Sequence, residues 1–411
     1  MPTKWKAKMV EIFLFLFYYT AVIFGVCAFT YRKRSIQENK QRLFNKISND
    51  STRTFTAVEQ KWLTWCCAIL RITSAVGSFY GGIVMWATTD PFYNAIMLLE
   101  SGITATGSIA LGIEMPFSSA RFVNIANYCM RLFQRTRQLL PHKSIMGQQQ
   151  FLFLLILTIF LCNDLSGLSV LLEYSDWREC ALAFAKLYML TGLMLSLYIG
   201  SIGYMSIGAL YTFMNSYMRE EFQPRARRLD CALKRNYNYR TCRYMRKLNR
   251  MTGELNVCLT LYNDIYRAAK MFHSDFRLNI LFSLTTAFVF IVIIIYNVLY
   301  RYIIEHEFEW GAVIFCTQIF LMVLIVILSA YSAVQGNISA SKLSLDSLYM
   351  GGNMEWNQSV EMFISRSNLY EFKPNMFGLF DISTDILLMF ISGSITYLTY
   401  IMQNTIKLNQ Q

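Results

Sequence analysis

The chain has 411 residues, of which 55% are hydrophobic and only 16% are charged. Soluble domains average about a quarter charged residues, so this composition predicts a membrane protein. The net charge of +12 does not indicate nucleic-acid binding, because membrane proteins collect Lys and Arg in their cytoplasmic loops. The ten cysteines and three histidines form no CxxC pair and no metal-ligand pattern. No nucleotide-binding or nucleophile motif occurs either. We therefore expect no enzyme, no cofactor, no metal site and no nucleic-acid partner.

Eight apolar stretches follow one another along the chain. A bilayer core takes about 20 apolar residues to cross as a helix, and most of the stretches reach that length. The third is the weakest, because Glu100 and Glu114 interrupt it. The first has an apolar core too long for a signal peptide. The stretches are 9–31, 62–88, 92–115, 150–173, 181–213, 277–303, 311–334 and 376–403.

The charges between these stretches predict an orientation. Segment 32–61 has eight Lys and Arg, 116–149 has five and 214–275 has thirteen, whereas 174–180 has one and 304–310 has none. Basic loops remain in the cytoplasm, so we expect the first three inside and the last two outside. Eight crossings would put the basic amino terminus outside, opposite an equally basic loop. That conflict disappears if the first stretch enters the membrane without crossing it.

The predicted fold class is therefore an all-α membrane protein with seven transmembrane helices and an N-terminal re-entrant or interfacial helix. The amino terminus lies inside and the carboxyl terminus outside, which is the reverse of a G-protein-coupled receptor. Three glycosylation sequons begin at Asn49, Asn337 and Asn357. All three fall in segments assigned to the cytoplasm, so none is expected to carry glycan.

The long basic segment 214–275 has helical periodicity. Its apolar and aromatic residues, such as Leu255, Leu259 and Tyr262, recur at helical spacing. This predicts that the fifth and sixth apolar stretches extend beyond the bilayer and pack together in the cytosol. The alternative is a solvated basic loop near anionic lipid. The chain divides into the re-entrant helix and transmembrane helices 1–4 (1–213), the cytoplasmic helical extension or anchor region (214–275), transmembrane helices 5–6 (276–334), a cytoplasmic loop (335–375), and transmembrane helix 7 with a short outer tail (376–411).

The last apolar stretch carries a polar stripe at helical spacing. Polar groups in a membrane helix face protein or water, because lipid leaves them without hydrogen-bond partners. The stripe therefore either bonds to a neighbouring helix or lines a water-filled path where several subunits bring this helix to a common axis. The spacing alone does not separate these uses. The stripe consists of Asp385, Met389, Ser392, Thr396, Tyr400, Gln403 and Lys407.

The same region carries a resemblance to a known family. Residues 396–403, Thr-Tyr-Leu-Thr-Tyr-Ile-Met-Gln, resemble the Thr-Tyr-five apolar-Gln-Phe signature of insect gustatory receptors, which are related to insect odorant receptors. Upstream, Gly378-Leu379-Phe380 resembles the Gly-x-Phe element with which that family opens this helix. The chain length and the eight stretches also fit. The sequence departs from the signature at Asn404, where the family usually has Phe. The motif positions are Gly378, Phe380, Thr396, Tyr397 and Gln403.

The resemblance implies a tastant-gated, non-selective cation channel subunit in the cell membrane of gustatory neurons. It implies a homo- or hetero-tetramer with related subunits, surrounded by lipid, whose last helices line the pore. By position, Gln403 is the pore residue, Tyr400 is a candidate gate, and Asn404 replaces an apolar gate residue. Thr396 and Tyr397 complete the motif, and Tyr397 is expected to pack against a neighbouring helix. Within the family, a bitter or otherwise aversive compound is the most frequent type of ligand.

The resemblance also implies a ligand pocket in the outer half of the helix bundle. Lys186 and Asp164 either pair with each other or bind a polar tastant, because an ionised group at membrane depth needs a partner. A structural role remains the alternative for each candidate. Arg71 is expected to be a snorkelling or paired residue. The pocket candidates are Tyr93, Glu100, Asn163, Asp164, Lys186, Tyr188, Tyr296, Asn297, Phe315 and Gln318.

A secondary transporter or other multi-span carrier is the alternative reading of the whole chain. Such carriers commonly consist of two similar halves with helices broken by Gly or Pro. This chain has six prolines, which lie at segment ends or in loops, and no doubling is evident. A channel is therefore favoured over a carrier.

Overall fold

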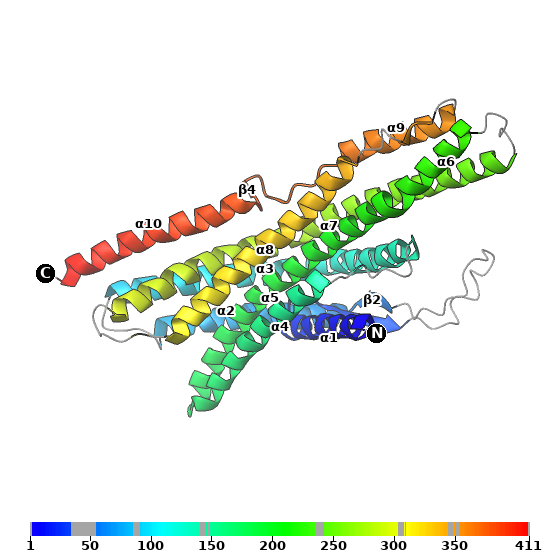
Figure 1. Ribbon diagram of the computed structural model, residues 1–411. Coiled ribbons are helices and arrows are strands. Elements are labelled where there is room, and N and C mark those ends of the chain that lie inside the picture. Colours follow the sequence, from blue (N-terminus) through cyan, green and yellow to red (C-terminus); the bar gives the residue numbers. More distant parts are fainter. Residues whose placement is uncertain are drawn as a thin grey trace. The chain divides into compact units, whose positions relative to one another are not determined.

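The computed structural model describes residues 2–33, 55–84, 91–139, 145, 148–235, 242–302, 308, 310–343, 348–350 and 353–409 (Figure 1). These residues are predominantly helical, as predicted, and each of the eight apolar stretches overlaps a helix. The α-helices are α1 (Pro2–Ile23), α2 (Lys61–Val84), α3 (Pro91–Leu139), α4 (Gln148–Ser166), α5 (Trp177–Ser216), α6 (Gln223–Arg235), α7 (Cys242–Tyr300), α8 (Trp310–Ser341), α9 (Met354–Leu369) and α10 (Thr384–Asn409). A 3₁₀ segment, Gly167–Glu173, follows α4, and a π-helical segment, Tyr217–Phe222, joins α5 to α6.

Two short antiparallel strand pairs add to the predicted helices. β1 (Phe29–Lys33) pairs with β2 (Phe55–Glu59), and β3 (Asn375–Met376) pairs with β4 (Phe380–Asp381). The first pair falls at the ends of the segment that was read as a basic loop. The Phe, Thr, Tyr and Val residues of both strands favour strand formation. Each strand is short, however, and lies beside a longer apolar or basic stretch, so the sequence alone predicts no strand there.

The first helix ends at Ile23, well before residue 31, because the chain forms a Schellman motif there. Gly25 has a φ of +65°, a left-handed conformation that glycine adopts without a steric penalty. The amide of Val26 donates to the carbonyl of Ala21 at 2.7 Å, and the amide of Gly25 donates to that of Val22 at 3.2 Å. This pair of bonds is the usual helix stop at glycine. The sequence analysis missed it.

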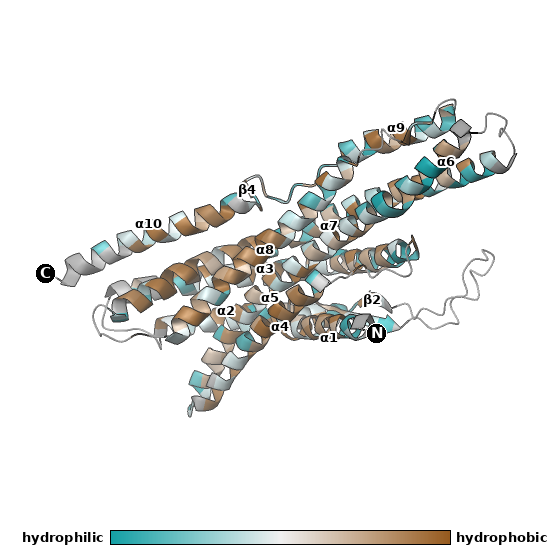
Figure 2. Cartoon of the chain, in the orientation of Figure 1, coloured by the Kyte–Doolittle hydropathy of each residue, from teal (hydrophilic) through white to brown (hydrophobic). Residues whose placement is uncertain are grey.

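Five helices within the described ranges are long and apolar enough to cross a membrane. They lie in Lys61–Ile83, Gln149–Ser169, Trp177–Ala232, Tyr244–Leu299 and Trp310–Ser341. Figure 2 shows that apolar residues concentrate in part of α7 and α8, whereas the end of α7 that lies beside α6 is hydrophilic. Seven crossings would require α3 and α10 as well, so the number of crossings and their orientation remain predictions.

The chain forms two compact units, which are described separately. Unit 1 comprises Met1–Val10, Arg131–Leu157 and Leu197–Gln411, and unit 2 comprises Glu11–Met130 and Thr158–Ser196. In unit 1, α7 is the central helix, since α8, α9 and α10 all pack on it (Figure 1). In unit 2, one small apolar core contains Cys67, Ala68 and Met115, and another contains Ala75, Ala105 and Met189.

A buried polar network joins α5, α7 and α8 in unit 1. The Tyr262 hydroxyl donates to Asn215 Oδ1 at 2.7 Å, and Asn215 Nδ2 donates to the carbonyl of Gly336 at 3.0 Å. Next to it, Asn337 Nδ2 donates to the Tyr211 hydroxyl at 3.2 Å. Such fully bonded networks fix the relative position of the helices that share them.

The structure describes two of the three sequon asparagines. Asn337 is buried, and its Oδ1 accepts from the amide of Phe372 at 3.0 Å. Asn357 bonds to Met350 through both side-chain atoms, at 2.9 and 3.0 Å. Both asparagine side chains thus form hydrogen bonds within the folded chain. Asn49 lies outside the described residues.

Candidate functional site

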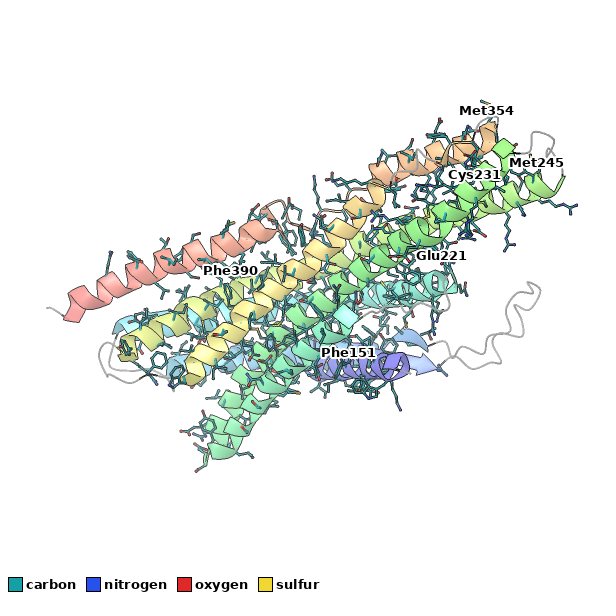
Figure 3. All side chains as sticks on the ribbon, in the orientation of Figure 1. Phe151, Glu221, Cys231, Met245, Met354 and Phe390 are labelled. Carbon is teal, nitrogen blue, oxygen red and sulfur yellow. The ribbon has the colours of Figure 1, made fainter. Side chains whose placement is uncertain are left out.

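The polar stripe of α10 points away from the rest of unit 1. Met389 is 61% exposed and Tyr400 is 63% exposed, as is Ile395 outside the stripe at 61%, whereas Ile386 in the first turn of the helix is 4% exposed. Ser392, Thr396 and Gln403 are also exposed. The described part of the stripe, from Asp385 to Gln403, is therefore exposed on the folded subunit. Figure 3 shows the described side chains along this helix, with Phe390 labelled.

The other side of α10 packs against α7. The Phe288 ring lies edge-to-face with Phe390, with ring centroids 5.4 Å apart, and contacts Tyr397 at 6.0 Å. A Cβ atom at Gly393 would lie 3.2 Å from the same Phe288 ring. Small and aromatic residues thus allow close contact between these two helices. Tyr397 bridges the packed and the open sides, since it contacts α7 and remains 57% exposed.

The hydroxyl groups on the open side bond to their own helix. Thr396 Oγ1 donates to the carbonyl of Ser392 at 2.8 Å, and Ser392 Oγ donates to that of Met389 at 3.3 Å. These bonds satisfy the hydroxyl hydrogens and leave oxygen lone pairs free to face a cation or water. The side chain of Asn404 lies outside the described residues.

A tight hairpin of β3 and β4 leads into α10 and contains the Gly-x-Phe element. Phe377 and Gly378 both have left-handed backbone conformations, with φ of +54° and +79°. The amide of Gly378 donates to Asn375 Oδ1, and Asn375 Nδ2 donates to Asp381 Oδ1 at 2.8 Å. Glycine is favoured at position 378 because its backbone turns through a region that side chains disfavour. The motif glycine therefore has a conformational role at the start of α10.

Two of the pocket candidates form an ion pair in unit 2. Lys186 Nζ on α5 lies 3.6 Å from Glu100 Oε1 on α3, and Glu100 is buried. The structure thus shows Lys186 paired with Glu100, while the expectation that Lys186 and Asp164 pair with each other or bind a polar tastant stays a prediction. Two buried or partly buried charges compensate each other in this way. Glu100 interrupts the third apolar stretch in the sequence, and its ion pair with Lys186 explains how a carboxylate can be buried there.

Tyr188 contacts the end of α1. It is buried, its hydroxyl donates to the carbonyl of Ile23 at 3.2 Å, and its ring stacks on Phe24 with centroids 5.4 Å apart. On α4, Asn163 is exposed and Asp164 is partly exposed. In unit 1, Tyr296 and Gln318 are buried, while Asn297 and Phe315 are partly buried. The side chain of Tyr93 lies outside the described residues. The candidates therefore divide between the two units.

Arg71 was expected to be a snorkelling or paired residue, and the structure shows a buried side chain with hydrogen-bond partners. It is 3% exposed, its Nη1 donates to the carbonyl of Gly25 at 3.3 Å, and its Nε donates to Ser108 Oγ at 3.3 Å. A cation at a helix C-terminus is stabilised by the helix dipole and by the carbonyls that lack intrahelical partners. Arg71 thus caps α1 from α2. The partner is far away in sequence, and no local pattern indicates the contact.

The sequence analysis also missed three residues next to the α10 hairpin. His273 on α7 contacts both Tyr204 on α5 and the carbonyl of Asn375 in β3. Arg277, one turn further along α7, lies over the Phe377 ring, with its Cζ 4.2 Å from the centroid. The sequence analysis considered the histidines as metal ligands alone. The spacing of four residues between His273 and Arg277, which puts both on one face of α7, was the available sign of a shared contact surface.

Comparison with known proteins identifies the class. The sequence pattern of the family described as "7tm Chemosensory receptor" matches residues 14–407. The chain therefore belongs to this family of multi-pass membrane chemosensory receptors, which is not a family of enzymes. The resemblance to insect chemoreceptors that the last helix indicated is confirmed.

Relatives in Drosophila melanogaster narrow the comparison to gustatory receptors. A protein named provisionally as gustatory receptor 93c is 26% identical over 370 residues, which cover 89% of this chain and 90% of the relative. The gustatory receptor for bitter taste 93a is 21% identical over 353 residues, covering 83% and 82%. Among solved structures, the insect olfactory receptor OR5 from Machilis hrabei has the same fold, with a TM-score of 0.59, 13% identity and 98% coverage of both chains.

Proposed function

We propose that this chain is a subunit of a tastant-gated, non-selective cation channel. The observation that carries the proposal is the outward-facing polar stripe of α10, whose other side is packed on α7. A helix that exposes hydroxyl and amide groups at membrane depth requires water or another subunit on that side. Four subunits that turn α10 toward a common axis would provide both. Membership in a chemosensory receptor family supports a ligand as the gating stimulus.

Each residue on the open side of α10 has a proposed role in permeation. Gln403 faces the passing cation with its amide oxygen, and Thr396 lines the path below it. The Tyr400 ring, 63% exposed, narrows the pore when four copies approach and closes it by steric block and dewetting. Asn404 makes the outer end of this constriction more polar than the family's usual Phe.

The membrane arrangement proposed from the charge count completes this picture. α2, α3, α4, α5, α7, α8 and α10 cross the bilayer of the cell membrane, and α1 enters it without crossing. The capping of α1 by Arg71 and Tyr188 supports a helix end inside the membrane, because such an end needs internal hydrogen-bond donors. Residues 214–275 and 335–375 lie in the cytosol, and lipid surrounds the outer helices.

The proposed ligand is a bitter or otherwise aversive small molecule. One of the similar Drosophila proteins is named for bitter taste, which supports this class for a related chain. Among the pocket candidates of unit 2, Glu100 and Lys186 offer charges and Tyr188 offers an aromatic ring, which are groups that ligand sites commonly use. Because the similar Drosophila proteins are named as gustatory receptors, we also propose expression in gustatory neurons, alone or with related subunits.

Whole-cell recording tests the proposal. Cells that express this chain, alone and with a related gustatory receptor, are exposed to quinine and denatonium, with sucrose as the contrasting tastant. We expect a bitter-evoked cation current that persists when G-protein signalling is blocked. Gln403→Ala is expected to change the relative permeability of Na⁺ and Ca²⁺ at unchanged surface expression. A current with identical selectivity in this variant would remove Gln403 from the pore.

A further inference from the structure

His273 connects the hairpin before α10 to α5. Its Nε2 lies 2.8 Å from the carbonyl oxygen of Asn375, and its Nδ1 lies 2.7 Å from the Tyr204 hydroxyl. Because a carbonyl only accepts, Nε2 must carry hydrogen and donate. In the neutral ring Nδ1 then accepts from the Tyr204 hydroxyl. One imidazole thus joins three segments: α5, α7 and β3.

Both ends of this connection are held in place. Tyr204 is fully buried, and its ring lies edge-to-face with Phe272, with centroids 5.4 Å apart. The His273 ring in turn lies edge-to-face with Phe372, at 6.3 Å. The packing leaves the hydroxyl and the imidazole little freedom to choose other partners. Displacement of α5 against α7 must therefore stretch or break the bond between Tyr204 and His273.

Asn375 transmits the constraint to the start of α10. Its backbone is bonded to His273, and its side chain bonds both to the amide of Gly378 and to Asp381 across the hairpin. The amide of Ile382 donates to the carbonyl of Pro374 at 2.9 Å, and α10 begins two residues later at Thr384. Asn375 therefore has two roles: its backbone carbonyl bonds the hairpin to α7, and its side chain bonds the two strands of the hairpin to each other.

We infer that the contact Tyr204–His273–Asn375 couples α5 to the gate, and that Tyr204 and His273 are positioning residues for α10. The inference rests on the proposed function and specifies how the pore helix is controlled. α5 is also the helix that carries the pocket candidates Lys186 and Tyr188. A shift of α5 changes the equilibrium of the hairpin, and through it the angle at which α10 begins. Such coupling requires a contact that differs between the two states, and we assign this role to the bond between Tyr204 and His273.

The first test reads the hairpin directly and needs no channel activity. The full chain is purified in phosphatidylcholine nanodiscs, and amide hydrogen exchange is followed in peptides that cover 374–383. We expect Tyr204→Phe, which removes a single hydroxyl, to accelerate exchange about fivefold, the typical net contribution of one hydrogen bond. His273→Ala also removes the bond to the Asn375 carbonyl, so it should accelerate exchange at least as much. Adding Tyr204→Phe to His273→Ala should change nothing further, because the connection to α5 is already broken. His273→Gln, which keeps a donor and an acceptor, should recover part of the protection.

Thr212→Val is the matched control on α5, because the Thr212 hydroxyl bonds only to its own helix, at the carbonyl of Gly208. Exchange in 374–383 should be unchanged in this variant. If Tyr204→Phe also leaves the hairpin unchanged, or if the two single effects add in the double variant, the coupling contact does not exist.

The second test measures gating in the same preparations. Single-channel recording in phosphatidylcholine bilayers gives the spontaneous open probability without any ligand. We expect Tyr204→Phe to lower it about fivefold, a typical coupling magnitude, at an unchanged Na⁺/K⁺ permeability ratio, and Thr212→Val to change neither. Faster hairpin exchange with an unchanged open probability would overturn the inference. A wild-type protein that never conducts would overturn the channel proposal and with it the gating role, while the exchange test would still report whether the connection exists.

Discussion

Arg71 donates a hydrogen bond from its guanidinium to the carbonyl of Gly25, and so closes the end of α1 from a different helix. The same guanidinium bonds to Ser108 on α3. One side chain thus holds together the end of the first helix and the two helices that follow it. The charge is placed where the carbonyls of α1 have no partners of their own, which makes a buried cation favourable there.

Replacing Arg71 tests this arrangement. Arg71→Met removes both bonds and leaves the Gly25 carbonyl buried without its partner, at a cost of about 1–3 kcal/mol in the free energy of unfolding. Arg71→Lys keeps the charge and should lose less. The stability of both variants is measured by thermal unfolding in detergent, with size-exclusion chromatography as the readout. The control is Arg250→Met at an exposed position on α7, which should stay within about 0.5 kcal/mol. Equal stability of Arg71→Met and the wild type would contradict the capping role.

The pair of Glu100 and Lys186 gives a second prediction. Glu100→Gln removes the negative charge that lies beside the Lys186 ammonium, and the partly buried position predicts a loss of about 2 kcal/mol in the free energy of unfolding, below the cost at a fully buried pair. The exchanged variant, Glu100→Lys with Lys186→Glu, should recover part of that loss because attraction between opposite charges is restored. The wild type, Glu100→Lys, Lys186→Glu and the exchanged variant form a double-mutant cycle, in which thermal stability is measured. Additive effects in the cycle would show that the two side chains do not interact.

The sequence predicted those features of the fold that depend on neighbouring residues within one segment of the chain. Hydropathy located a helix at each apolar stretch, because burial of apolar residues in lipid is encoded within each segment. The spacing of Asp385, Ser392 and Thr396 located the polar side of α10 for the same reason. The strand pairing of β1 with β2 and the capping of α1 by Arg71 were missed, because their partners are distant in the chain.

The candidate site shows the same division. The resemblance in the last helix led to the correct family, since its motif is contiguous. The Glu100–Lys186 pair was missed although both residues were named, because composition gives no information on which helices are neighbours. His273 was set aside because it lacked metal-ligand spacing, yet its contacts with Tyr204 and Asn375 come from two other segments. Hydrogen bonds between distant segments are what a single sequence does not show.

The hairpin glycine yields a third prediction. Gly378 has a φ of +79°, and an alanine there costs about 1 kcal/mol in backbone strain. Gly378→Ala should therefore loosen the hairpin, whereas Gly378→Asn should do so less, since asparagine tolerates left-handed conformations better. Exchange of the amide of Ile382, bonded across the hairpin, reports the effect. Equal protection in Gly378→Ala and the wild type would show that the turn is not under this constraint.

Close contact between α5 and α8 leads to the last prediction. A Cβ atom at Gly336 would lie 2.7 Å from the Cβ of Tyr211, closer than such atoms approach in proteins. Gly336→Ala must therefore push α8 away from α5, at a cost of about 1–3 kcal/mol for overpacking. It should also weaken the bond from Asn215 to the Gly336 carbonyl. Gly253→Ala on α7 is the matched control, because among the described residues nothing beyond the adjacent backbone of its own helix lies within 4 Å of its added Cβ. In that helix interior, alanine should raise stability by about 0.5–1 kcal/mol. The two glycine-to-alanine changes are thus expected to shift the unfolding temperature in opposite directions, and shifts of the same sign would contradict the close contact of α5 and α8.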